Sequence, residues 1–298
     1  MATGLTLSTS SNLQTTQQRL LAAATIAFEP AAPDPSMVRQ VSLPAGHYQG
    51  IVATYARLTQ ASALTEGVDL AQVQQLATNT LTITPSEHGI IVTISKRAAR
   101  RQFDSDLVST AGEQMGVALR EREAKDIITL YDGFSKSIVG SGSALDITYY
   151  RGAVAYMITD NDTDYGPAPM PVHAAFHAEQ ISDIILDLSD PGTTNAGTGR
   201  EGIVANDLVK RWWRGSDRVY GIPIMHSGYI ARDSDDDSKG AIFHENALRE
   251  IEEGEVDVTE EGDNSLRVIE HGMFKSWGEG ERADAHGVEI YSDTLAVV

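Results

Sequence analysis

A glycine-rich segment is the first place in the sequence where residue spacing points to a known binding chemistry. Gly197, Gly199 and Gly202 have the spacing of a dinucleotide-binding fingerprint. That chemistry needs the glycines between a strand and a helix, so that the helix N-terminus meets the pyrophosphate. Here the preceding segment has a helical pattern and ends in Ser-Asp-Pro-Gly at 189–192. We therefore interpret the glycines as part of a flexible loop.

Histidines and aspartates supply two further spacings that could ligate a metal ion. His173 and His177 are four residues apart, but the preceding Pro-Val predicts a strand that leads into a helix, so the two rings point differently. Residues 233–237 resemble the start of a calcium loop, whose sixth and twelfth positions hold glycine and glutamate. Those positions hold Ser238 and His244 here. We expect a solvated acidic loop, with adventitious divalent binding as the alternative, and no metal site.

The overall composition excludes several other classes of function. The chain has 298 residues, 23 basic and 42 acidic side chains, a formal net charge of −19 and no cysteine. An acidic chain is poorly suited to bind nucleic acid by neutralising phosphates. The absence of cysteine removes disulfides, thiolate metal sites and cysteine nucleophiles. No Walker A motif or Gly-x-Ser-x-Gly elbow is present, so the sequence predicts no catalytic residue, cofactor or metal.

The first forty residues do not have the pattern of a folded domain. Residues 1–18 are polar and almost uncharged, and residues 19–28 form one short apolar helical segment. No signal peptide is expected, because a basic region followed by an apolar run is missing. Pro30, Pro33 and Pro35 then favour extended backbone. The segment is either a flexible leader or an arm that packs on something outside its own fold.

Strand patterns follow on both sides of a polar segment. Residues 37–60 are rich in β-branched and aromatic residues, whereas residues 61–79 are polar. Residues 80–95 alternate, with a turn at Pro85–Gly89, and predict a hairpin. A structureless loop of about twenty residues is uncommon in a compact domain. We therefore expect a long two-stranded flap that reaches away from the body.

The clearest periodic signal predicts one long helix over residues 104–134. Apolar residues recur at helical spacing, Glu121 and Lys125 form a favourable i, i+4 pair, and Gly133 ends the run. About thirty residues at a rise of ~1.5 Å give a helix of roughly 45 Å, which we interpret as a spine. Beyond it the pattern of an α/β unit predicts helices at 146–158, 177–190 and 203–213, and strands at 170–176, 219–227 and 287–298.

The order of these parts, together with four of the segments, resembles the major capsid proteins of tailed bacteriophages, the Hong Kong 97-type family. Residues 64–95 resemble the flap and its return strands, and residues 100–135 the spine helix. Residues 169–188 resemble the strand and helix that open the axial lobe. Residues 287–298 resemble the returning C-terminal strand.

This resemblance implies an α+β fold with an N-arm, an extended β-hairpin flap (E-loop), a peripheral lobe with the spine helix, and an axial α/β lobe. The N-arm would be residues 1–40 and the flap 41–80. The peripheral lobe would be 81–140 with 281–298, and the axial lobe 141–280.

The resemblance also implies partners. Copies of the chain would form hexamers and pentamers of an icosahedral shell around double-stranded DNA, made in the host cytoplasm and located in the virion. A portal, a separate scaffold and a cement protein would be further partners. The flap contains no lysine, so the covalent lysine–asparagine crosslink of some members is not expected.

Charge suggests which residues join the copies. Lys96, Arg97, Arg100 and Arg101 form a basic run, and the flap carries Glu66 and Asp69. We expect the two flap acids to contact Arg97, Arg100 or Arg101 of an adjacent copy. Two alternatives stay open: an encapsulin-like compartment shell of the same fold, and a cytoplasmic α/β enzyme with an unrecognised acidic site.

Overall fold

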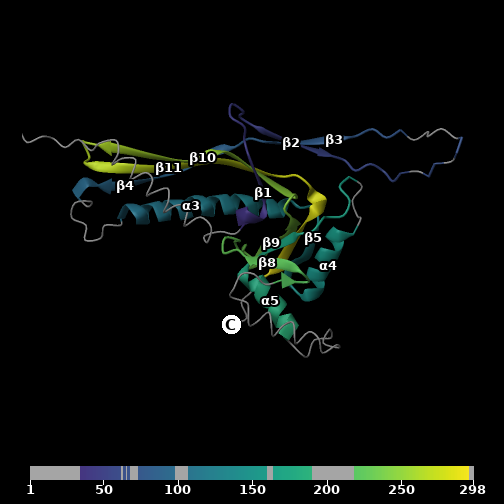
Figure 1. Cartoon of the computed structure of the whole chain (residues 1–298). Coiled ribbons are helices and arrows are strands. Elements are labelled where there is room, and N and C mark those ends of the chain that lie inside the picture. Colours follow the sequence, from purple (N-terminus) through teal and green to yellow (C-terminus); the bar gives the residue numbers. More distant parts are fainter. Residues whose placement is uncertain are drawn as a thin grey trace, which may run out of the picture.

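The computed structural model has an elongated body, a projecting hairpin and a mixed lobe (Figure 1). A long helix runs beside a long sheet, and the lobe lies below one end of both. In the parts described, no helix is long and apolar enough to cross a membrane. The structure describes residues 34–61, 63–64, 66–67, 73–97, 107–159, 164–189 and 218–294.

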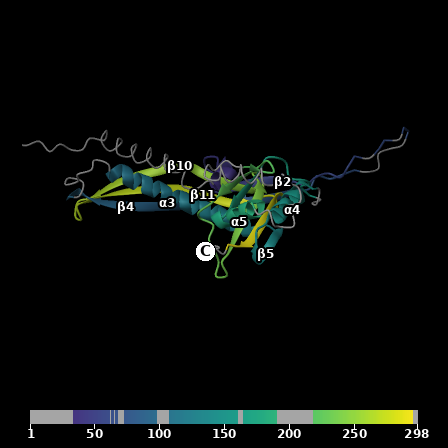
Figure 2. The same ribbon diagram turned by 90° about the horizontal axis from the view of Figure 1, so that it is seen from below.

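The elongated body is built on a four-stranded sheet in the order β1-β10-β11-β4. β10 and β11 pair antiparallel over most of their length, β11 pairs antiparallel with β4, and β1 joins β10 in parallel. Figure 2 shows the helix α3 lying along this sheet. The four strands are β1 (Arg39–Ser42), β4 (Ser86–Ser95), β10 (Leu248–Asp263) and β11 (Val268–Glu281).

The predicted spine is the helix α3 (Leu107–Thr129), followed by the 3-10 turn η2 (Leu130–Gly133). Its buried face packs Met115 and Leu119 against Met273 and Trp277 of β11. Its outer face holds the predicted pair, with Lys125 Nζ 2.5 Å from Glu121 Oε1. The helix is thus confirmed where described, and residues 104–106 of the prediction lie outside that part.

The projecting element is a two-stranded antiparallel hairpin of β2 (Gly50–Tyr55) and β3 (Thr78–Ile83). It reaches away from the body as the polar segment predicted (Figure 1). The predicted hairpin over residues 80–95, however, is wrong. β3 pairs with β2 and β4 pairs with β11, so the chain changes sheets at Pro85. The alternating pattern located both strands but carried no information about their partners.

The lobe contains a six-stranded sheet in the order β5-β12-β9-β6-β8-β7, with α4 (Ile147–Ile158) and α5 (Ala178–Ser189). One apolar cluster joins both helices to the sheet. A second cluster joins the lobe to the ends of α3 and of the N-terminal 3-10 turn η1 (Asp34–Met37). Its strands are β5 (Ser137–Ala144), β6 (Val172–Phe176), β7 (Arg218–Val219), β8 (Ile222–His226), β9 (Asp237–His244) and β12 (Gly287–Asp293).

The helices predicted at 146–158 and 177–190 are present, as are the strands near 170, 220 and 290. The helix predicted at 203–213 lies outside the described residues. Asp146 caps α4, since its Oδ1 accepts the Tyr149 N–H at 2.8 Å.

Three strands pair outside the lobe in which the sequence predicted them. β10 and β11, expected in the axial lobe, pair with β1 and β4 beside α3. β12, expected in the peripheral lobe, pairs with β5 and β9 of the six-stranded sheet. Both differences arise because strand partners are set by tertiary packing, which a single sequence does not record. The division into two lobes itself stays a prediction.

Candidate assembly surfaces

The β2–β3 hairpin carries large apolar side chains that face solvent in the single chain. Val73 is 93% exposed and Leu64 is 78% exposed, both in the outer segment between the strands. Large exposed apolar side chains gathered on one projecting element favour a protein contact surface. The other exposed apolar side chains of the hairpin are Ile51, Tyr55, Leu58 and Leu76.

The described part of the hairpin contacts the body at its base and just beyond the end of β2. Arg57 donates its backbone N–H to Asp164 O at 2.6 Å. At Gly50 a side-chain Cβ would lie 2.2 Å from Ile251 Cδ1, so β2 passes close to β10 here and a larger residue would displace the Ile251 side chain. In Figure 1 the outer part extends beyond every other described element. The hairpin is therefore anchored up to Arg57, and its outer part projects beyond the body (Figure 1).

The structure describes only two of the five predicted contact residues. Glu66 is exposed in the outer part of the hairpin, and Arg97 is exposed just after β4. These two regions point toward opposite ends of the molecule in Figure 1, so they are far apart within one copy. The neighbouring Lys96 donates to Asn264 Oδ1 at 2.9 Å. Asp69, Arg100 and Arg101 lie outside the described residues.

The N-terminal turn η1 is anchored by a buried carboxylate that the sequence did not reveal. Asp34 is fully buried and accepts two hydrogen bonds, from Tyr131 Oη at 3.1 Å and from Ser227 Oγ at 2.7 Å. Burial raises the pKa of Asp34, while the two hydroxyl donors oppose that rise. The anchor fixes the chain entering β1 to the end of α3 and to the lobe.

We predict that Asp34→Ala destabilises the folded chain by about 1–3 kcal/mol, because it leaves two buried hydroxyl groups without their acceptor. Asp34→Asn keeps the shape and one acceptor oxygen, so it should cost less. The measurement is the denaturant midpoint of the unassembled chain. Equal midpoints for wild type and Asp34→Ala would show that the anchor contributes nothing.

A cluster of charged groups lies where α3, β10 and β11 meet. Lys275 Nζ is 2.7 Å from Glu123 Oε1 and 2.7 Å from Glu252 Oε1. Burial alone would lower the pKa of Lys275, but Glu123 and Glu252 together raise it. Arg120 Nη1 adds a contact of 3.1 Å to Glu123 Oε2. We call this group, with Gln40 and Glu250, the Glu123 cluster.

The same cluster holds the only group of potential metal ligands found within the described ranges. Oxygen atoms of Glu123, Glu250 and Glu252 lie within 4.8 Å of one another. The Lys275 ammonium contacts two of these three carboxylates and already supplies the local positive charge. We therefore assign no metal to the cluster.

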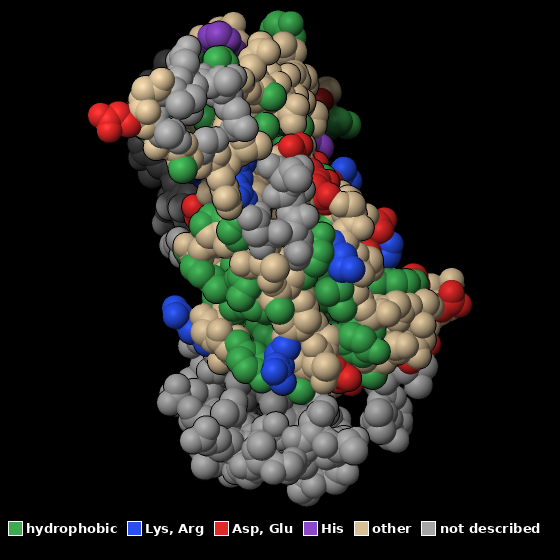
Figure 3. All heavy atoms as spheres, turned by 90° about the vertical axis from the view of Figure 1, so that its right-hand side faces the viewer, with side chains coloured by type: hydrophobic (Ala, Val, Ile, Leu, Met, Phe, Trp, Pro, Cys, Tyr) green, Lys and Arg blue, Asp and Glu red, His purple; other side chains and the backbone are tan. Residues whose placement is uncertain are grey.

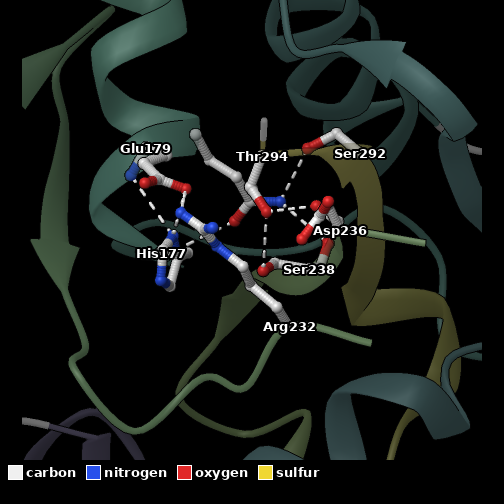
Figure 4. A network of polar contacts seen from close by, with 8 residues as sticks. His177, Glu179, Arg232, Asp236, Ser238, Ser292 and Thr294 are labelled. Carbon is white, nitrogen blue, oxygen red and sulfur yellow. Dashed lines mark hydrogen bonds and ion pairs between the residues drawn. The ribbon is translucent and has the colours of Figure 1, made fainter. Parts of the chain in front are cut away.

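The two histidines with metal-ligand spacing, His173 and His177, have structural positions in the lobe. The His177 ring accepts the backbone N–H of Glu179 at Nδ1. The backbone N–H of His177 donates to Gln180 Oε1 at 3.0 Å. Burial is the main reason why the pKa of His177 is lowered. Glu179 in turn forms an ion pair with Arg232 (Figure 4). His177 thus belongs to the start of α5, and His173 lies apart from it in β6.

The acidic loop before β9 is closed by its own hydrogen bonds. Asp233 Oδ1 accepts the N–H groups of Asp235 and Asp237, at 2.9 and 3.0 Å. Thr294 Oγ1 donates to Asp236 O and lies 3.3 Å from Ser238 Oγ (Figure 4). The expected solvated loop is therefore correct except at Asp237, which is buried and accepts the Gly142 N–H.

The side of the lobe that carries α4 is a second apolar surface. Figure 3 shows apolar side chains on this face, with single basic groups among them. Arg151 lies over the Tyr220 ring at 5.8 Å from its centroid. The exposed large apolar residues in and near α4 are Tyr149, Ile158, Met170 and Tyr220.

Comparison with known proteins decides the family. The model of the phage capsid protein family matches residues 78–291, which is well over half of the chain. The chain belongs to the phage capsid protein family. No curated protein matches it significantly.

Solved phage structures share the fold of this capsid protein. The acid-stable capsid of Helicobacter pylori bacteriophage KHP30 matches with a TM-score of 0.67 and 13% identity, over 88% of this chain and 91% of that one. The capsid of cyanophage Pam1 matches with a TM-score of 0.64 and 12% identity, over 91% of this chain and 92% of that one. A chain of Mycobacterium phage Che8 matches with a TM-score of 0.59 and 13% identity, over 82% of this chain and 84% of that one.

Family membership confirms the resemblance to tailed-phage capsid proteins and the mixed α+β fold. Capsid proteins are structural components of the virion, which favours a structural role over the enzyme alternative. Two buried acidic groups of the capsid protein were not predicted from the sequence. Asp34 stood in a proline-rich segment, and Glu123 stood in a run of charges that looked solvated. Neither position has a sequence signal that separates it from an exposed acid.

Proposed function

We propose that this capsid protein forms the hexamers and pentamers of an icosahedral shell that encloses double-stranded phage DNA. The observation that carries the proposal is the β2–β3 hairpin, which is anchored to the body up to Arg57 and exposes apolar side chains along its length. Such a hairpin lowers its free energy by lying on another copy. Contacts between two different faces close into rings when the rotation per copy allows it.

The elements take the following roles in this proposal. Residues before β1 are the N-arm, and the β2–β3 hairpin is the flap, or E-loop. The long sheet with α3 is the peripheral domain, and the six-stranded sheet with α4 and α5 is the axial domain. The strand pairs β10–β11 and β12–β9 support this revised division, because they join each strand to its sheet.

The acidic charge of −19 suits a shell that encloses DNA without adhering to it. The chain is made in the host cytoplasm and works with a portal, a separate scaffold and a cement protein. An encapsulin-like compartment remains the alternative. Neighbouring genes separate the two: a portal and a terminase accompany a phage capsid, and cargo enzymes accompany an encapsulin.

Electron microscopy of the purified full-length chain tests the proposal. We expect rings of six and five copies, and closed particles made from them. Tubes or sheets built from six-copy rings would also support the assembly contacts, since curvature is then set by other proteins. Small compact oligomers without rings at every concentration would overturn the proposal.

We predict that Glu66→Lys weakens the shell, because it places a like charge against the basic run of the adjacent copy. One exposed ion pair contributes only ~0–1 kcal/mol, but the effect is repeated at every contact of the shell. The measurement is the denaturant concentration at which particles dissociate. Glu66→Lys combined with Arg97→Glu should recover part of the loss. Unchanged dissociation of the single variant would rule out the pairing.

A further inference from the structure

Glu250 is a fully buried carboxyl group at the junction of four elements. It lies in β10, with Gln40 of β1 as its Cα partner on one side and Glu279 of β11 on the other. Glu123 of α3 faces it from the helix. The start of the hairpin is adjacent, since Gly50 sits directly on Ile251.

The hydrogen bonds of the Glu123 cluster leave one atom without a donor. Glu123 accepts from Arg120 and Lys275, and Glu252 accepts from Lys275. Glu250 Oε2 accepts from Gln40 Nε2 at 3.0 Å. Glu250 Oε1 is buried and has no donor. An ionised carboxylate only accepts, so Glu250 and Glu123 would face each other as two acceptors.

The charges of the cluster do not balance if every group is ionised. Glu123, Glu250 and Glu252 would carry three negative charges against the two positive charges of Arg120 and Lys275. Glu279 of β11 and Asp126 of α3 also face this region, and Arg122 of α3 pairs with Asp126 at 2.9 Å. These three groups together do not relieve the negative excess. An uncompensated buried charge is costly, so a proton or a cation must neutralise it.

A proton fits the geometry better than a metal ion. Lys275 Nζ already stands 2.7 Å from one oxygen of Glu123 and one of Glu252, where a shared cation would sit. A proton on Glu250 supplies the missing donor and removes the excess charge in one step. A hydrogen bond between a carboxylic acid and a carboxylate is also among the stronger kinds.

We propose that Glu250 is a neutral carboxylic acid that donates a hydrogen bond to the Glu123 carboxylate and so makes the packing of β1 and β10 against α3 sensitive to alkali. Loss of the proton leaves two buried carboxylates in contact and weakens the contact between α3 and the sheet. The inference concerns a single copy of the chain. It therefore stands or fails independently of the assembly proposed above.

The electrostatics agree with the geometry. Burial, the hydrogen bond with Glu123 and the charge of Glu123 raise the pKa of Glu250 to about 9. Burial would raise the pKa of Glu123, but the hydrogen bond with Glu250 and the charges of Lys275 and Arg120 lower it. The two carboxyl groups thus divide the roles of donor and acceptor.

The sign of the pH dependence follows from proton linkage. The pKa of Glu250 is about 9 in the folded chain and near 4.5 when the chain is unfolded. Between these values the folded state holds a proton that the unfolded state has released, so stability falls as pH rises. The stabilising contribution of Glu250 is fully present below pH 4.5 and is lost once the pH rises above about 9.

Infrared spectroscopy and pH-dependent unfolding test the proposal on the full chain. At neutral pH, Glu250→Gln should show less absorption from protonated carboxyl groups than wild type, and this difference should disappear at alkaline pH. Glu250→Gln keeps a donor, so its stability should fall less with rising pH. Its unfolding at neutral pH should release about one proton fewer than that of wild type. The control is Glu253→Gln, an exposed acid in the same strand.

Three results would overturn the proposal. The first is a wild-type spectrum without a protonated carboxyl band at neutral pH, which does not depend on any variant folding. The second is a Glu250→Gln protein with the same pH dependence as wild type and Glu253→Gln. The third is a wild-type melting temperature that falls on adding a chelator and recovers with calcium or magnesium, which would assign the neutralising charge to a cation.

Discussion

Replacing Leu64 by aspartate is expected to abolish shell formation while the subunit keeps its fold. Leu64 is 78% exposed in the single chain, so a charge there costs the isolated subunit little. In the proposed shell the same position is covered by another copy, and an unpaired charge becomes buried. A penalty of about 1.4 kcal/mol per contact already lowers an association constant tenfold, and every copy in the shell carries it.

Two measurements check this result. Sedimentation should show the variant as unassembled chain, and its denaturant midpoint should equal that of unassembled wild type. Leu64→Met is the matched control, because it keeps an apolar side chain of similar size, and it should still form particles. Val73→Asp should repeat the loss, since Val73 is 93% exposed. Normal particles from both aspartate variants would show that the outer hairpin makes no assembly contact.

The largest loss of stability is expected from Lys275→Ala. Its ammonium contacts Glu123 and Glu252, and the side chain is only 12% exposed. Removing one partner of a buried ion pair leaves an uncompensated charge and costs about 3–5 kcal/mol. The measurement is the free energy of unfolding of the unassembled chain from a denaturant titration.

Lys125→Ala is the matched control for this prediction. Lys125 also pairs with a glutamate, Glu121, but both side chains are well exposed on the outer face of α3. An exposed pair of this kind contributes only about 0–1 kcal/mol. Similar losses for the two alanine variants would mean that the Glu123 cluster is not a buried charge network.

The sequence predicted the elements better than their partners. α3, α4 and α5 were predictable because a buried helical face repeats with the helical period, and the hairpin because a polar segment separates two strands. The partners of β3, β4, β10 and β11 were not predictable. The alternation within a strand records which face is buried and not which strand lies beside it.

The buried polar groups were the other part that the sequence did not predict. Glu123 stands in a run of charged residues and Lys275 in a largely apolar stretch, and only their tertiary positions bring them together as a buried pair. Asp34 follows two prolines and resembles a loop residue, yet its acceptors are used by Tyr131 and Ser227, from segments far along the chain. The predicted contact residues share this limit, because their partners belong to another copy.

Sedimentation velocity of the purified full-length chain over a range of concentrations tests the central claim most directly. We expect fast-sedimenting particles whose share of the protein rises with total concentration and which are missing from Leu64→Asp under the same conditions. A single species of one to four copies at every concentration, identical for wild type and Leu64→Asp, would contradict self-assembly through the hairpin.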